Sequence, residues 1–201
     1  MANLKEVRTR ITSVNSTQQI TSAMKMVAAS KLRRAQMAIV NMRPYAKKLN
    51  EILQNVTGSL DQNEDNVFGD VRPVNKALIV AVTSNRGLCG AFNANVIKMS
   101  RGLMENEFAD ISKSGGVDII TIGKKASDFF SKEGYQHIGS YDDFYSDLSF
   151  DNVSPLASEL LEKFANKEYD KIYIVYNQFK NAATQHVLAE QLLPVITSEN
   201  A

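Results

Sequence analysis

The first 57 residues contain no glycine and a single proline, Pro44, and this feature limits most strongly what the chain can fold into. The period of the apolar side chains predicts one long helix over residues 1–57, roughly 80 Å in length at about 1.5 Å per residue. Pro44 removes one backbone hydrogen bond, so we expect it either to kink this helix or to mark a junction. The apolar residues recur every three or four positions, with one polar break at Gln18 and Gln19: Leu4, Val7, Ile11, Val14, Ile20, Met24 and Val27.

The same segment carries nearly all of the excess positive charge. Residues 1–57 hold ten Lys or Arg against two Glu, a net of +8, whereas the remaining residues hold 13 basic and 20 acidic ones, a net of −7. Such a split is typical of a partner surface, and a helix this long needs a second helix or a partner to cover its apolar stripe. Three partners are considered: nucleic acid, an anionic membrane, or a protein assembly with an acidic inner wall. The first two fit less well, because Tyr45 is the one aromatic residue here and the basic residues are not confined to one face.

After this helix the sequence pattern changes. Residues 58–72 are polar and acidic, which predicts a linker loop, and residues 73–201 form a separate globular domain in which short apolar runs alternate with helical stretches. This alternation predicts the α/β class, with an open and largely parallel sheet covered by helices on both faces. We expect strands over 77–83, 117–122, 134–140, 171–176 and, at a sheet edge, 185–193, with helices ending near 108 and over 124–132 and 152–166.

The turn after the first strand, residues 84–90, is the strongest candidate for a small-molecule site, because backbone amides at a helix start bind phosphate. Its GLCG sequence lacks the spaced glycines of a dinucleotide site and the Gly-Lys-Ser/Thr of a Walker loop. We therefore favour a tight turn here, with Cys89 as a buried small residue, and a surface helix start for the GKKAS sequence at 123–127. His137 and His186 lie in separate segments without a second ligand at zinc spacing. No metal site, cofactor site or catalytic constellation is predicted.

Several features bear on location. A single cysteine excludes an intrachain disulfide, and no run of about 18 apolar residues could cross a membrane. The N-terminal sequence MANLKE lacks the apolar stretch of a secretory signal. From the residues alone we expect a soluble protein that faces the cytosol.

Five motifs resemble one known family, and they occur in the family's order across the whole chain. The segment ITSAMKMVAASKLRRAQ at 20–36 looks like part of the N-terminal helix of the gamma subunit of F-type ATP synthase. The other four are RPYA at 43–46, SNRGLCGAFN at 84–93, KIYIVYNQF at 171–179 and QLLP at 191–194. Together these matches are highly specific.

The resemblance implies a long N-terminal helix that forms half of an antiparallel coiled coil, followed by a Rossmann-like three-layer α/β/α domain with a mostly parallel sheet. It implies a central-stalk rotor that couples ion flow through the membrane ring to ATP synthesis in the alpha/beta head and that catalyses nothing itself. The implied partners are the alpha and beta subunits, the epsilon subunit and the c-subunit ring. Nucleic acid is not among them, no cofactor is implied, and membrane association is expected only through the complex, at the cytoplasmic face of the bacterial inner membrane.

The same resemblance assigns candidate partner-binding residues. Met24 and Lys25 fall in the segment that resembles the contact with the acidic lever loops of the beta subunits, and Arg33 and Arg34 lie further along it. Arg86, in the turn before the glycines, resembles a residue that contacts the lower rim of the head.

The chain departs from the family at its C-terminal end. The long C-terminal helix that normally follows the QLLP segment is absent, so the second half of the coiled coil is missing from residues 1–201. Two other hypotheses stay open on the residues alone: a small-ligand or nucleotide-binding α/β domain, which nucleotide would stabilise against heat, and a nucleic-acid-binding protein, whose binding would weaken steeply with salt.

Overall fold

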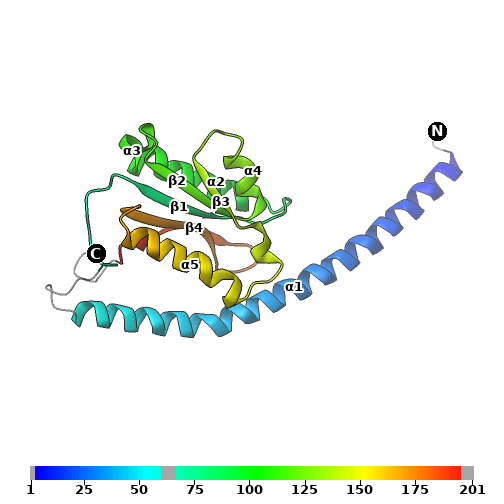
Figure 1. The fold of residues 1–201 in the computed structure, drawn as a ribbon. Coiled ribbons are helices and arrows are strands. Elements are labelled where there is room, and N and C mark those ends of the chain that lie inside the picture. The colour runs from blue at the N-terminus through cyan, green and yellow to red at the C-terminus, as the bar shows by residue number, and fades with distance from the viewer. Residues whose placement is uncertain (1–2, 60–66, 196–201) are drawn as a thin grey trace. The chain divides into compact units, whose positions relative to one another are not determined.

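The computed structural model describes residues 3–59 and 67–195, and these fall into two compact units, Met1–Val56 and Thr57–Ala201 (Figure 1). The fold confirms the α/β prediction. In chain order the elements are α1 (Leu4–Ser59), β1 (Ala77–Val82), α2 (Phe92–Gly102), the π-helix η1 (Leu103–Glu107), α3 (Ala109–Lys113), β2 (Val117–Ile122), α4 (Lys124–Phe130), β3 (His137–Ser140), the 3-10 helix η2 (Asp142–Tyr145), α5 (Phe150–Ala165), β4 (Lys171–Phe179) and β5 (Gln185–Leu193).

The first unit is the single helix α1. It continues to Ser59, two residues beyond the predicted end, and it runs through Pro44, which therefore marks no junction. Because this unit is a single helix, no second element of the unit covers its apolar residues. The side chains of Leu4, Ile11 and Met24 are 66%, 55% and 67% exposed. Threonine hydroxyls in its first half find partners inside the helix by donating to the carbonyl four residues earlier, at Thr9, Thr12, Thr17 and Thr21.

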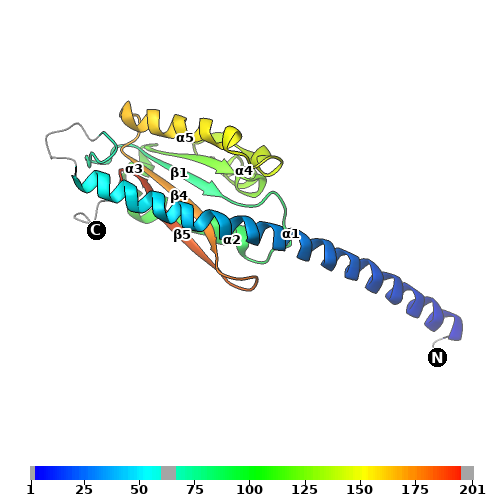
Figure 2. The ribbon, with the colours of Figure 1, turned by 90° about the horizontal axis from the view of Figure 1, so that it is seen from below.

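The second unit is built on a five-stranded sheet with the order β3-β2-β1-β4-β5. The first four strands are parallel, and β5 returns antiparallel to β4 (Figure 2). The crossovers between the parallel strands follow from the sequence, since a helical stretch separates each of the first four strands from the next. The antiparallel return of β5 brings Val195 back to Phe68, where the Val195 amide donates to the Phe68 carbonyl at 2.8 Å.

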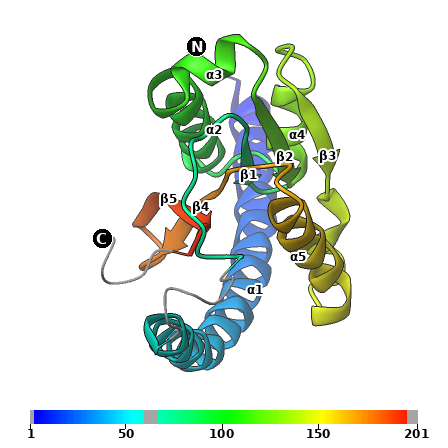
Figure 3. The same ribbon diagram turned by 60° about the vertical axis from the view of Figure 1, so that its left-hand side comes forward.

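Helices cover both faces of this sheet, which makes the domain a three-layer α/β/α structure (Figure 3). The central strands β1 and β2 are buried on both faces, which explains their almost continuous apolar sequences. Successive residues of β1 face opposite sides of the sheet and enter two different core clusters. Leu78 packs in the same cluster as Leu160 and Phe164 of α5. Its neighbour Ile79 packs in the other cluster, with Val96 of α2 and the residues of α4.

The carboxyl ends of β1 and β2 meet in a close approach that only glycine permits. Gly123 has φ +104°, and a Cβ there would lie 2.1 Å from the Thr83 carbonyl oxygen. Thr83 is buried and ties the two strand ends together, because its Oγ1 donates to the Gly123 carbonyl at 3.1 Å and accepts from the Ala126 amide at 2.9 Å. This arrangement fixes where β1 ends and α4 begins, and with them the turn that precedes α2.

The helix expected to run to residue 108 differs from the prediction. The α-helix α2 ends at Gly102, a π-helical turn follows over Leu103–Glu107, and α3 begins at Ala109. The wider turn lets Met104 and Phe108 both reach the core, where they are 3% and 4% exposed. β3 begins at His137, three residues later than expected, and β4 continues to Phe179, three residues beyond the expected end. β5 spans 185–193 as predicted.

Candidate functional site

The basic residues assigned to partner binding on α1 all point into solvent. Lys25, Arg33 and Arg34 are exposed, and in the described part of the chain no ion pair or hydrogen bond engages these side chains. Met24 lies beside them with 67% of its surface exposed. Within the described residues no acidic side chain pairs with Lys25, Arg33 or Arg34, so these cations are accessible to a partner.

Helix geometry decides how these side chains are displayed. At about 100° per residue, Arg33 and Arg34 project in directions about 100° apart, and Lys25 lies about 180° around the helix from Arg34. The positive charge therefore surrounds this stretch of α1 and does not form a single stripe. Such a display suits a partner that encloses the helix better than a flat surface that meets one side of it.

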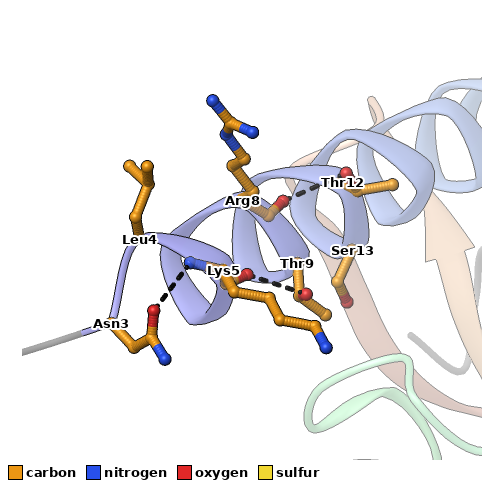
Figure 4. Close-up of a pocket in the computed structure, with 7 residues that line it drawn as sticks. All are labelled: Asn3, Leu4, Lys5, Arg8, Thr9, Thr12 and Ser13. Carbon is orange, nitrogen blue, oxygen red and sulfur yellow. Dashed lines mark hydrogen bonds between the residues drawn. The ribbon is translucent and has the colours of Figure 1, made fainter.

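The hollows found along α1 are shallow depressions of its own surface. Figure 4 shows the first of them, and all of its lining side chains belong to the first three turns of this one helix, from Asn3 to Ser13. A depression lined by a single helix cannot enclose a ligand, because pockets that hold small molecules bury most of the ligand surface. Its polar groups are also used locally, as in the bonds of Asn3 to the Lys5 amide and of Thr9 to the Lys5 carbonyl.

The fifth assigned residue, Arg86, lies in the turn between β1 and α2. Asn93 of α2 holds this turn from within: its Nδ2 donates to the Arg86 carbonyl at 3.1 Å, and its Oδ1 accepts from the Ser84 amide at 2.9 Å. Asn85 fastens the turn to its neighbours, donating to the Asp142 carbonyl and accepting from the Lys124 amide, each at 2.9 Å. The backbone of the turn is thus held at several points while the Arg86 side chain remains exposed.

The same hydrogen bonds argue against phosphate binding at the start of α4. Three successive amides there already have partners: Lys124 donates to Asn85, Lys125 to the Ser84 carbonyl at 3.3 Å, and Ala126 to Thr83. An anion binds at the start of a helix through backbone amides that have no other hydrogen-bond partner. The GKKAS segment is a surface helix start, as predicted.

The expectation for Cys89 is wrong. Cys89 is exposed, because the turn lies outside the sheet and its side chain has no core to enter. Leu88 beside it has φ +62° and is fully exposed, a left-handed conformation that is uncommon for a bulky apolar residue. Neither feature could be read from the sequence, since the conformation of a GLCG turn depends on the hydrogen bonds from Asn93 and Asn85.

A second group of functional candidates, which sequence reasoning missed, lies at the opposite ends of the strands. Asp118 and Asp170 are only 4% and 8% exposed, at the start of β2 and just before β4. Burial alone would raise the pKa of Asp170, but the Asn75 amide, the Arg72 guanidinium and the Lys76 amide hydrogen-bond its carboxylate and hold the pKa below its usual range. Burial, followed by the hydrogen bond to Asp118, raises the pKa of Tyr169 well above its ordinary value. A carboxylate within or beside a buried strand is the sequence signal that could have revealed these sites.

Within residues 3–59 and 67–195, no group of three or more His, Cys, Asp or Glu residues is arranged to hold a metal ion. No described helix is long and apolar enough to cross a membrane.

Comparison with known proteins gives consistent matches. A family model described as ATP synthase matches residues 3–201. The chain is 52% identical over 195 residues to the ATP synthase gamma chain of Christiangramia forsetii and 53% identical over 195 residues to that of Flavobacterium johnsoniae. Each alignment covers 97% of this chain and 66% of the relative, so the chain spans just under two thirds of the length of these curated relatives.

Two solved structures share the fold. One is the central stalk and c-ring of the Tetrahymena thermophila mitochondrial ATP synthase, with a TM-score of 0.63 and 28% identity over 87% of this chain and 72% of the other. The second is the rotor of the Euglena gracilis mitochondrial ATP synthase in rotational state 1, with a TM-score of 0.55 and 26% identity over 92% of this chain and 61% of the other.

Proposed function

The chain belongs to the ATP synthase gamma family, and from this membership we propose that it acts in the central-stalk rotor of the enzyme. In this role it couples ion flow through the membrane ring to ATP synthesis in the alpha/beta head, and it catalyses no step itself. The observation that carries the proposal is α1, a 56-residue helix that presents the cations of Lys25, Arg33 and Arg34 and a series of apolar side chains to solvent. A helix of this kind needs a surrounding partner, and the head of the enzyme would supply one.

The partner surface on α1 is assigned to Met24, Lys25, Arg33 and Arg34. Acidic loops of the beta subunits are the complementary partner, because exposed cations on several sides of one helix fit a ring of acidic groups around it. Arg86 supplies a further cationic contact to the head from the turn before α2. The epsilon subunit and the c-subunit ring are the proposed partners of the α/β domain. Location follows from the complex: the chain would lie at the cytoplasmic face of the bacterial inner membrane, attached only through its partners, with no cofactor and no nucleic acid.

A direct test mixes the chain with purified alpha and beta subunits and follows both co-elution in size exclusion and ATPase activity in the same fractions. We expect co-elution, with activity above that of alpha and beta alone. Charge attraction between exposed groups weakens with salt, so raising the ionic strength from 0.05 to 0.5 M (about a threefold fall in the Debye length) should reduce co-elution. Separate elution of the chain at low salt would contradict the proposal for residues 1–201.

Charge-reversal variants locate the contact. The triple variant Lys25→Glu, Arg33→Glu and Arg34→Glu should lose co-elution while its α/β domain keeps the wild-type melting temperature, since these three residues are exposed and belong to the other unit. A matched control makes the same change of charge at three exposed lysines of the α/β domain: Lys113, Lys132 and Lys180. If both triple variants bind alpha and beta equally well, α1 is not the electrostatic partner surface.

A further inference from the structure

Strand β5 forms one edge of the described sheet. It is the last strand in the order β3-β2-β1-β4-β5, and among the described strands it pairs with β4 alone. β1 follows β4 only as far as Val175, whereas the pairing of β4 with β5 continues to Phe179 and Gln185 (Figure 2). The far half of this hairpin is therefore a two-stranded ribbon, a structure that is marginal in water until another strand is added.

The hydrogen-bonding groups on the outer side of β5 can be identified from the hairpin. The Lys180 amide donates to the Thr184 carbonyl at 3.3 Å, so these two residues form a hydrogen-bonded pair. Hydrogen-bonded and non-hydrogen-bonded pairs alternate along an antiparallel ladder, and the even-numbered residues of β5 therefore bond to β4. The amides and carbonyls of Val187, Ala189 and Gln191 point the other way, and within residues 67–195 these groups have no main-chain partner.

The sequence of β5 does not protect this edge. Natural edge strands are commonly blunted by proline, by lysine, by a bulge or by very short length. Residues 185–193 read QHVLAEQLL, a strand of nine residues without proline, glycine, lysine or arginine. The one irregularity lies at the Ile172/Tyr173 end of the hairpin, so residues 185–190 keep a regular register. A long open edge of this kind can accept another strand through main-chain hydrogen bonds.

The side chains of β5 indicate that the added strand is a second copy of β5. His186 and Glu190 are both exposed and lie on the same face of the strand, with Leu188 between them. When two copies run antiparallel about a two-fold axis at Leu188, His186 of each copy lies opposite Glu190 of the other. Both pairs then unite an imidazole N–H donor with a carboxylate. Moving the axis to Val187 or Ala189 brings neither pair together.

Glu190 already has one neighbour within its own copy. Burial, followed by the hydrogen bond to Glu190, raises the pKa of the Tyr176 hydroxyl on β4. A carboxylate has two oxygens and accepts several hydrogen bonds, so the contact with Tyr176 is compatible with a second contact across the edge.

We propose that the chain forms a two-fold dimer by edge-to-edge pairing of β5, with Leu188 at the axis. In this register Val187 lies opposite Ala189 and Gln185 lies opposite Gln191, and each such pair exchanges two main-chain hydrogen bonds. These are the residues whose amides and carbonyls point outward, so the dimer pairs the open edge without disturbing the bonds to β4. The inference concerns the chain by itself and does not rest on the proposed rotor function.

The first experiment measures amide hydrogen exchange in the 201-residue chain over about a hundredfold range of concentration. The Ala189 amide points outward and should exchange at least tenfold more slowly at the highest concentration, because it is then bonded to the second copy. The Leu188 amide bonds to β4 and should be protected at every concentration. If Ala189 exchanges at the same rate throughout, this edge takes no second copy and the proposal fails.

A proline variant separates the outer edge from the rest of the strand. Val187→Pro removes one outward amide and leaves the bonds to β4 in place, as proline does on natural edge strands. This variant should stay monomeric and lose the concentration dependence at Ala189, while Leu188 remains protected. Dimers of Val187→Pro that are as tight as those of the wild type would overturn the proposal.

The second experiment tests the register by exchanging charges, with the dimer dissociation constant measured by sedimentation. His186→Glu sets two carboxylates opposite each other and should weaken the dimer at least tenfold. The double variant His186→Glu with Glu190→Lys restores opposite charges and should return the constant to within about threefold of the wild type. Ser158→Glu, which adds the same charge at an exposed position of α5, is the control and should leave the constant unchanged.

Two results of this second experiment would contradict the dimer. Self-association that His186→Glu leaves unchanged would place the contact elsewhere in the chain, for example at the exposed apolar residues of α1. A weakened His186→Glu dimer that the double variant does not restore would overturn the register with its axis at Leu188.

Discussion

Gly123→Ala should nearly unfold the α/β domain, although it adds a single methyl group. Gly123 has φ +104° and ψ 133°, a backbone conformation open to glycine and costly for other residues, at about 1–3 kcal/mol. The added Cβ would lie 2.1 Å from the Thr83 carbonyl oxygen and 2.7 Å from its carbon, and both are backbone atoms that no rotamer change can move.

Relieving that overlap requires β1 and β2 to separate at their carboxyl ends. This separation breaks three hydrogen bonds: the one from the Thr83 amide to Ile122, and the two that Thr83 Oγ1 forms with Gly123 and Ala126. At roughly 1 kcal/mol each, their loss and the backbone strain together amount to about 4–6 kcal/mol. A domain of this size is typically stable by about 5–15 kcal/mol, so the variant should be near the limit of folding.

Urea denaturation followed by tyrosine fluorescence measures this loss on the α/β domain, because only one of the seven tyrosines lies in α1. A measurement of helix content would instead report mainly on α1. Gly134→Ala is the matched control: Gly134 also has a positive φ, +75°, but a Cβ there meets nothing within 4 Å. Gly134→Ala should cost only the strain of a left-handed conformation, about 1–2 kcal/mol. Equal midpoints for the two variants would refute the steric argument.

Two further predictions concern single side chains. The pKa of Asp170 is lowered in the folded chain, so its contribution to stability is complete above about pH 4 and is lost as the pH falls through the folded pKa. Asp170→Asn should therefore flatten the dependence of the urea midpoint on pH over that range. An unchanged dependence would show that another group is responsible. Cys89 is exposed, so a maleimide should label the native chain with one equivalent, and the labelling rate should be within a few-fold of the rate in denaturant. A labelling rate at least a hundredfold slower in the native chain would mean that the thiol is covered.

The sequence predicted the elements whose pattern is local. A glycine-free stretch with helical period gives α1, and the apolar runs of β1 and β2 are read directly because both faces of those strands are buried. The break after Gly102 was missed, since a π-helical turn depends on whether Met104 and Phe108 can both reach the core. Such choices are settled by packing across the sheet and not by the period of the helix.

The same contrast between local pattern and distant contacts applies to the candidate sites. The excess of positive charge on α1 could be read from the sequence because it is a property of composition, whereas the assignment of Lys25, Arg33 and Arg34 to a partner came from the resemblance and stays a prediction. The Arg72–Asp170 pair was not, because its partners lie 98 residues apart and a single sequence does not show which arginine meets which aspartate. Cys89 was placed wrongly for a related reason, since its exposure depends on how Asn93 and Asn85 hold the turn.

The hydrogen bond between Val195 and Phe68 has a consequence for how such a chain could have been assembled. Since β5 returns antiparallel to β4, the residues by which the chain enters and leaves the α/β domain lie next to each other. A domain whose two ends meet can be inserted into a longer chain at one point, and it can gain or lose elements without changing the spacing of the segments on either side. Loops and helices between Phe68 and Val195 can therefore change in length without moving these two residues apart.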